Sequence, residues 1–123
     1  MIKLAWFKTS PASINLLNSK PGVYVISVLL KNGSFAAIYV GQSVKLKERM
    51  FEHFSENETN VELKKFLKNN YEFKISYAYV EENKLDGLEK YLISIFRPRY
   101  NTQVGNGDES YKCSEPNVIP WPF

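Results

Sequence analysis

Two apolar runs, residues 22–30 and 34–41, stand on either side of an Asn32-Gly33 pair. Both runs are rich in Val, Ile, Tyr and Phe, and an Asn-Gly pair between such runs is a strong signal for a β-hairpin. A two-residue turn at Asn32 and Gly33 would make Tyr24 and Tyr39 diagonal neighbours on one face of the sheet, roughly 7 Å apart. The residues predicted to lie opposite each other are Tyr24 with Gly41 and Ile26 with Tyr39.

Two stretches with helical spacing follow the hairpin. Residues 43–54 carry an apolar stripe at every fourth position, Leu46, Met50 and Phe54, with Ser43 as the expected N-cap. Residues 60–69 predict a second helix, whose buried side is expected to comprise Val61, Leu63, Phe66 and Leu67. Residues 71–80, rich in Tyr, Phe, Ile and Val, then predict a third strand.

The remaining segments complete a single-domain plan. Ser10-Pro11 predicts the start of a short lead-in helix, because proline is favoured at the first helical position. Residues 84–96 predict the last helix, and the expected order is β-β-α-α-β-α. We therefore divide the chain into a lead-in (1–20), a domain (21–101) and an irregular C-terminal tail (102–123). The last aromatic residues of the tail are expected to pack on the domain.

Composition limits the classes of protein that fit. The chain has 123 residues, of which 44% are hydrophobic, so it can bury a core without disulfide bonds or a structural metal ion. Its single cysteine, Cys113, cannot form an internal disulfide, and no apolar run is long enough to span a bilayer. A reduced, cytoplasmic protein without a membrane partner is predicted. The net charge of +3 fits a nucleic-acid partner, but it fits ordinary surface charge equally well.

An acidic residue, Glu89, interrupts the apolar stripe of the last helix. The stripe has steps of four, three and four residues and consists of Leu85, Glu89, Leu92 and Phe96. The carboxylate is therefore expected to face the core, where an ionised acid needs a cationic partner. An arginine, a lysine or a metal ion could be that partner, and a buried salt bridge with Arg49 or Lys45 is the purely structural alternative.

A row of basic residues lies on the helix predicted at 43–54. Lys45, Arg49 and His53 are four residues apart, so three potential cations are expected to align on one flank. Taken singly, these residues would be ordinary solvated side chains, and Tyr24 and Tyr39 would be ordinary aromatic residues of a hairpin. Only their combination and order point to a site.

Taken together, these positions resemble the signature of the GIY-YIG nuclease family. The matching residues are Gly22-Val23-Tyr24, Tyr39-Val40-Gly41, Arg49, His53, Glu89 and, after Pro98, Asn101. Arg49 follows Gly41 by eight residues, and His53 follows four residues later. The resemblance covers residues 21–101 and implies an α/β (α+β) sandwich, in which a small three-stranded antiparallel sheet is flanked by helices. The order of elements predicted from the residues agrees with that fold.

The resemblance implies a metal-dependent DNA endonuclease that hydrolyses a phosphodiester bond by direct attack of water. The implied catalytic residues are Tyr24, Tyr39, Arg49, His53, Glu89 and Asn101. Glu89 would hold Mg²⁺ (or Mn²⁺), a hard ion that takes one or two protein oxygens and keeps most of its waters. Tyr39 is the expected general base, and Tyr24 is expected to position water or phosphate.

The other implied residues contact phosphate or hold the site. Arg49 would present a planar donor fork to the scissile phosphate, and His53 would orient a tyrosine or the attacking water. Asn101 would hold the architecture or touch the phosphate. The substrate-binding residues are expected to be Gly41, Gln42 and Lys45. Gln42 stands where some relatives have a lysine, so Lys45 is the candidate to replace that contact.

Two alternatives stay open at this stage. The first is a catalytically silent nucleic-acid-binding or interaction module with the same fold, and the second is an RNA-directed nuclease. DNA is the predicted partner. No separate recognition domain is visible, so specificity is expected to come from loops, the tail, a homodimer or a partner protein.

Overall fold

The computed structural model describes residues 2–101, 105, 107–114 and 117–123. Its centre is a five-stranded sheet in the order β2-β5-β3-β4-β7. The strands span Ala5–Lys8 (β2), Gly22–Leu29 (β3), Phe35–Ser43 (β4), Phe73–Tyr79 (β5) and Val118–Ile119 (β7). The helices are Pro11–Asn15 (α1), Leu46–His53 (α2), Val61–Leu67 (α3) and Leu85–Phe96 (α4), which the 3₁₀ turn Glu82–Lys84 (η1) precedes. The predicted α/β class and the three central antiparallel strands are confirmed.

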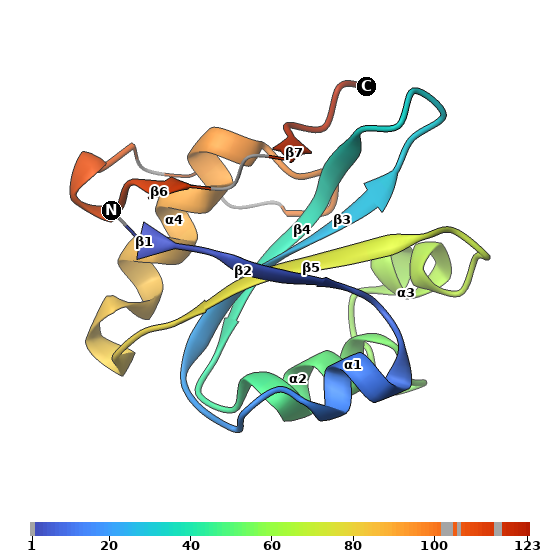
Figure 1. The fold of residues 1–123 in the computed structure, drawn as a ribbon, viewed down its shortest axis with the longest axis horizontal. Coiled ribbons are helices and arrows are strands. Elements are labelled where there is room, and N and C mark those ends of the chain that lie inside the picture. The colour runs from blue at the N-terminus through green and yellow to red at the C-terminus, as the bar shows by residue number, and fades with distance from the viewer. Residues whose placement is uncertain (1, 102–104, 106, 115–116) are drawn as a thin grey trace.

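The sheet divides the helices into two layers because successive residues of a strand face opposite sides. Val23 and Val25 of β3 pack with the apolar side of α4 in one cluster. Tyr24 and Ile26 pack with residues of α1, α2 and α3 in the other. Figure 1 shows α4 on one side of the sheet and the three shorter helices on the other. No helix in the described ranges is long and apolar enough to cross a membrane.

The hairpin of β3 and β4 has the predicted register but a different turn. Leu30 and Ser34 close the loop by a hydrogen bond from Leu30 N to Ser34 O, which leaves three residues between them. Gly33 has a φ of 88°, which glycine adopts without strain. A register shift between Ile26 and Ser27 then compensates for the longer loop, so Tyr24 still pairs with Gly41 and Ile26 with Tyr39. The predicted two-residue turn was therefore wrong, but the register shift, a β-bulge, preserves the predicted pairing of Tyr24 with Gly41.

The helices largely match their predicted ranges, with two corrections. Leu46 and Met50 are fully buried, but α2 begins three residues after Ser43, which ends β4 and accepts a hydrogen bond from Lys45 N. Ser43 is therefore not the N-cap of α2. On α3 the side chain of Asn60 caps the helix and Leu63 is buried, but Val61 is 60% exposed and does not belong to the buried side.

The lead-in and the tail contain more regular structure than the sequence indicates. β2 extends the sheet beside β5, and β7 extends it beside β4 in parallel. A separate two-stranded sheet pairs Ile2–Lys3 (β1) with Cys113–Ser114 (β6), and the 3₁₀ turn Glu109–Tyr111 (η2) precedes β6. The sheet is thus wider than the three strands predicted. The added strands have two to four residues, too few for a periodic pattern to identify them.

Candidate active site

Tyr24 and His53 meet inside the layer that contains α2. Tyr24 comes from the middle of β3 and His53 from the last turn of α2, and both side chains are essentially inaccessible to solvent. The Tyr24 hydroxyl lies 2.5 Å from His53 Nε2, so His53 orients a tyrosine, as the sequence suggested. The Tyr24 ring is fully buried and its hydroxyl contacts His53, and the role of Tyr24 in positioning water or phosphate stays a prediction.

A carboxylate that the sequence reasoning missed, Glu58, completes this group. Its side chain is fully buried in the loop between α2 and α3, where Oε2 contacts His53 Nδ1 and lies 3.4 Å from an Arg49 guanidinium nitrogen. Asn60 N donates to Glu58 Oε1 at 3.0 Å. Burial raises the pKa of Glu58, but these hydrogen bonds and the nearby positive charge outweigh it and lower the pKa to about 2. Glu58 is therefore ionised at neutral pH.

The ionised carboxylate determines how His53 is protonated. Burial lowers the pKa of His53 from its ordinary value of 6.5, and although Glu58 opposes this effect, the imidazole is neutral at pH 7. An acceptor at Nδ1 places the single proton there, which leaves Nε2 as the acceptor for the Tyr24 hydroxyl. The predicted row of three cations on α2 is therefore wrong: His53 is buried and neutral, and Lys45 is the N-cap residue, whose non-helical backbone does not continue the row.

Tyr39 and Arg49 form the more accessible side of the site. The Tyr39 ring packs 6.3 Å from that of Tyr24 and 5.2 Å from the His53 imidazole, measured between centroids. Burial raises the pKa of the Tyr39 phenol above 10, while the charge of Arg49 and a hydrogen bond from it act in the opposite direction. Arg49 also contacts Glu52 at 3.3 Å, and its side chain keeps 22% of its surface exposed. It can therefore reach a ligand from solvent while it stabilises a phenolate.

Gly41 lies where the two tyrosines approach β4 most closely. A Cβ at this position would lie 2.6 Å from Cζ of Tyr24 and 2.9 Å from Cε2 of Tyr39, closer than side-chain atoms pack. The glycine therefore makes room for both rings. Its contacts are with the tyrosines, which gives it a packing role in addition to the substrate contact expected from the sequence.

Glu89 lies at the edge of the buried face of α4 rather than in the core. Leu85, Leu92 and Phe96 of the predicted stripe are buried, whereas Glu89 is partly exposed, and Leu88 rather than Glu89 fills the core position. Gln42 Nε2 donates to Glu89 Oε1 at 3.4 Å and to Asp86 Oδ1 at 2.6 Å. The Glu89 charge helps to raise the pKa of both Tyr24 and Tyr39, which places the carboxylate in the same electrostatic neighbourhood.

The donor set around Glu89 fits a hard divalent ion. Among the described residues, no group of three or more His, Cys, Asp or Glu side chains could hold a metal, so a tight all-protein cage is not formed there. Mg²⁺ does not need such a cage, because it commonly takes one or two carboxylates and keeps several waters. Glu89, which is partly exposed, and Asp86, which is exposed one turn earlier, meet that requirement.

Asn101 acts on the backbone of β4. Its Oδ1 accepts from Val40 N and its Nδ2 donates to Val40 O, both at 2.7 Å, so one side chain satisfies both groups of that residue. Tyr100 N also donates to Ile38 O at 2.8 Å. These contacts bracket Tyr39, and of the two roles considered for Asn101 they match the architectural one.

Comparison with known proteins identifies the family. A model described as the UvrC-like GIY-YIG domain matches residues 20–102. The UvrABC system protein C of Clostridioides difficile (strain 630) is 36% identical over 99 residues, which are 77% of this chain and 15% of that protein. The protein of the same name from Thermoanaerobacter sp. (strain X514) is 32% identical over 106 residues, 84% of this chain and 16% of that protein. The chain thus spans about a sixth of the length of these relatives.

Solved structures agree with that assignment. The magnesium-bound GIY-YIG N-terminal endonuclease domain of UvrC from Thermotoga maritima superposes with a TM-score of 0.54 and 25% identity. The match covers 74% of this chain and 93% of that domain. A point mutant of that domain, bound to its divalent cation, is 23% identical with the same TM-score and supports the fold. The family match, the relatives and the shared fold agree: the chain belongs to the GIY-YIG family and carries a UvrC-like GIY-YIG domain.

Proposed function

We propose that this chain is a metal-dependent DNA endonuclease that hydrolyses phosphodiester bonds by direct attack of water. The observation that carries the proposal is the convergence of two phenols, a guanidinium, an imidazole and a carboxylate from β3, β4, α2 and α4. Cleavage of a phosphodiester needs fixed positive charge for the phosphate, a proton acceptor for water and relief of charge on the leaving oxygen. The bacterial UvrC domain of known structure that shares this fold was solved with magnesium bound.

Each residue receives a role from its surroundings. Arg49 binds the scissile phosphate and lowers the cost of ionising Tyr39, which accepts the proton of the attacking water. Tyr24, His53 and Glu58 form a buried chain of contacts that positions Tyr39 from behind. Glu89 is the ligand for Mg²⁺ or Mn²⁺, and the bound ion would supply charge relief to the phosphate and leaving oxygens. Gln42 orients the Glu89 carboxylate, and exposed Lys45 binds a flanking phosphate.

A plasmid-nicking assay tests this proposal. Purified protein should convert supercoiled plasmid to the nicked form with Mg²⁺ or Mn²⁺ and not with EDTA. Glu89→Ala should lower the rate at least about a hundredfold, as expected when a group that stabilises transition-state charge is removed. Glu62→Ala removes an exposed carboxylate of α3 and should retain the wild-type rate. Equal nicking by wild type and Glu89→Ala, or nicking in EDTA, contradicts the proposal.

The substrate is proposed to be DNA, and the compartment the cytoplasm, where bacterial DNA lies. Matched DNA and RNA oligonucleotides in the same assay distinguish this from an RNA-directed nuclease. Faster cleavage of RNA would reject the DNA assignment. Sedimentation of the protein with and without DNA would show whether a homodimer forms on the substrate.

A further inference from the structure

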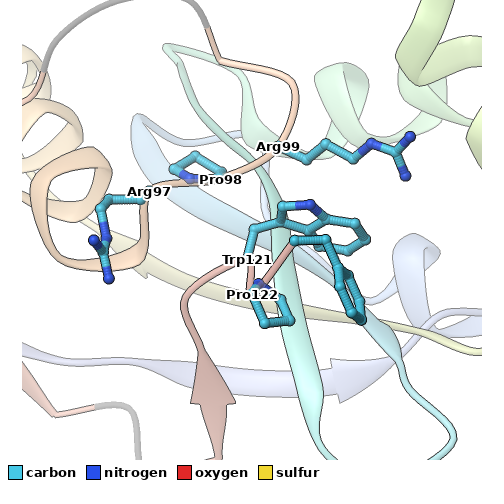
Figure 2. Close-up of a pocket in the computed structure, with 6 residues that line it drawn as sticks. Arg97, Pro98, Arg99, Trp121 and Pro122 are labelled. Atoms are coloured by element: carbon cyan, nitrogen blue, oxygen red, sulfur yellow. The ribbon is translucent and has the colours of Figure 1, made fainter.

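A cavity lies at the C-terminal end of α4, apart from Tyr24 and Tyr39. It has a volume of about 910 Å³ and is lined by Arg97, Pro98, Arg99, Trp121, Pro122 and Phe123. We name it the Arg-Trp pocket. Figure 2 shows Trp121 between the two arginine side chains, which extend in different directions. Three of its six residues come from the tail and lie outside residues 20–102, so the pocket is partly built from sequence that the family match does not include.

Aromatic rings hold the guanidinium of Arg99 in place. Its Cζ lies 5.0 Å from the ring centroids of both Trp121 and Tyr100, and 5.5 Å from that of Phe66. Trp121 in turn packs edge to face with Phe123, whose side chain is 87% exposed. The pocket therefore contains a guanidinium group stacked on aromatic rings, that of Arg99, and an exposed aromatic side chain, that of Phe123.

The side chains that line the pocket carry a net positive charge. Within the described parts of the chain, Arg97 and Arg99 form no ion pair with a carboxylate, and both are exposed. No carboxylate side chain lines the cavity. Its chemistry suits a ligand that combines negative charge with a flat ring, because guanidinium groups bind phosphate and aromatic rings stack on bases.

The pocket is mechanically connected to the candidate active site. The segment from Arg97 to Asn101 leaves α4 and fastens to β4 on both sides of Tyr39, through Tyr100 to Ile38 and through Asn101 to Val40. Trp121 is tied to the end of α4, where this segment begins, since the backbone N–H of Trp121 donates to Phe96 O at 3.3 Å. The segment therefore connects the pocket to the strand that carries Tyr39.

We infer that the Arg-Trp pocket binds unpaired nucleotides of the DNA substrate, next to the bond that is cut. The inference rests on the proposed nuclease function and narrows its substrate to DNA with a single-stranded portion. In a duplex the base faces are covered by their neighbours, so Trp121 and Phe123 could not stack on them, whereas an unpaired base offers an open face. Arg97 and Arg99 would bind the phosphates on either side of that base.

The chain offers a direct optical test, because it has two tryptophans and only one of them lines the pocket. In Trp6→Phe protein the fluorescence comes from Trp121 alone. Titration with a thymidine 12-mer in EDTA should quench it saturably, and a blunt 12-base-pair duplex should quench it much less. In Trp121→Phe protein, where Trp6 is the remaining fluorophore, the 12-mer should leave the emission nearly unchanged.

A charge variant extends the test without disturbing the core. Arg99→Gln should weaken binding of the 12-mer on the order of tenfold, as expected for loss of a stacked, phosphate-binding cation, and should leave duplex binding within twofold. Lys31→Gln, at the exposed tip of the hairpin, removes the same charge elsewhere and should change neither affinity.

The outcomes separate this inference from the proposed function. Absence of saturable quenching, equal quenching by the duplex, or tighter binding of a uridine 12-mer would overturn the assignment to unpaired DNA. If plasmid nicking still depended on Glu89 and Mg²⁺, the nuclease function would survive that result. Loss of Glu89 dependence with intact quenching would instead overturn the function and leave a DNA-binding pocket.

Discussion

Glu58 is the single residue on which the protonation of the buried site depends. Its carboxylate contacts His53 Nδ1 and holds the imidazole in the tautomer that accepts from Tyr24. An Arg49 guanidinium nitrogen lies 3.4 Å from the same oxygen, so the buried negative charge has a partner on each side. A buried acid that is both paired and hydrogen-bonded favours the folded state only while it stays ionised.

Glu58→Gln should therefore change how stability depends on pH. The folded pKa of Glu58, about 2, is below its ordinary value of 4.5, so its contribution is complete above pH 4.5 and is lost as pH falls toward 2. That contribution is at most about 3 kcal/mol. Urea unfolding at several pH values should show a difference between wild type and Glu58→Gln that shrinks below pH 4.5.

The His53 imidazole also makes the folded state less stable on acidification, and its effect begins at a higher pH than that of Glu58. Its folded pKa is lowered from 6.5, so its contribution is present above pH 6.5 and declines on acidification. Glu81→Gln, an exposed substitution, should differ little from wild type at every pH. A Glu58→Gln difference that stayed constant from pH 7 to pH 3 would show that Glu58 does not stabilise the fold through its charge.

Gly41→Ala should destabilise the protein and impair cleavage. The new methyl group would overlap the rings of Tyr24 and Tyr39, and overpacking of a buried site typically costs about 1–3 kcal/mol. The expected readouts are a lower urea midpoint and a reduced nicking rate. Gly107→Ala is the matched control, because nothing lies within 4 Å of a Cβ there. Equal midpoints for the two variants would contradict the packing role of Gly41.

At the scale of elements, the connection from α4 to β4 determines where Tyr39 lies. α4 ends at Phe96, and its C-cap residue Arg97 adopts the left-handed conformation with a φ of 41° and so turns the chain toward β4. Asn101 then pairs with Val40 as a neighbouring strand would, although no regular strand is formed there. A single amide side chain thereby supplies the two hydrogen bonds that the backbone of a neighbouring strand would make to Val40.

Asn101→Ala should loosen this connection. It removes two side-chain hydrogen bonds to Val40, and we expect a loss of about 1–3 kcal/mol in the free energy of unfolding. Cleavage should fall while metal-independent binding of the DNA persists. The control is Asn69→Ala, whose amide makes one exposed bond to Lys65 O at 3.3 Å. Faster hydrogen exchange of the Val40 amide in Asn101→Ala, but not in Asn69→Ala, would show that the lost bonds to Val40 cause the destabilisation. Unchanged exchange in Asn101→Ala would contradict this role of Asn101.

At the scale of the whole molecule, the first and last segments close the domain. β7 covers the edge of β4, β6 pairs with β1, and Val118 joins the cluster beneath α4. The Tyr111 ring packs against Gly87 of α4 so closely that a Cβ there would overlap it. The tail segments therefore contribute to both apolar clusters, Trp121 being packed against the second.

Removal of residues 102–123 should destabilise the domain. It exposes the surface that Val118 and Trp121 cover and leaves β1 without β6, so a loss of at least about 3 kcal/mol is expected. Thermal unfolding followed by circular dichroism measures the change. Deletion of Pro122 and Phe123 alone serves as the control, because both side chains are exposed. A truncated chain as stable as the full chain would show that the tail is not part of the folded unit.

The amino-acid sequence by itself determined the two central strands, the pairing of Tyr24 with Gly41 and the shared face of Tyr24 and Tyr39. These properties follow from local rules: turn residues, alternation along strands and the 3.6-residue period of helices. The family signature also depends only on order and spacing along the chain. Each of these can be read without knowing which elements lie next to each other.

The tertiary structure alone decided how deeply each side chain is buried and which residues contact each other. It buried Tyr24 and left Tyr39 partly exposed, moved Glu89 to the edge of its helix face, and brought a loop carboxylate, Glu58, against His53. It also gathered Arg97, Arg99 and Trp121 into one pocket. Burial and ion pairing depend on what covers a residue from elsewhere in the chain, and no periodic pattern in the segment itself records that.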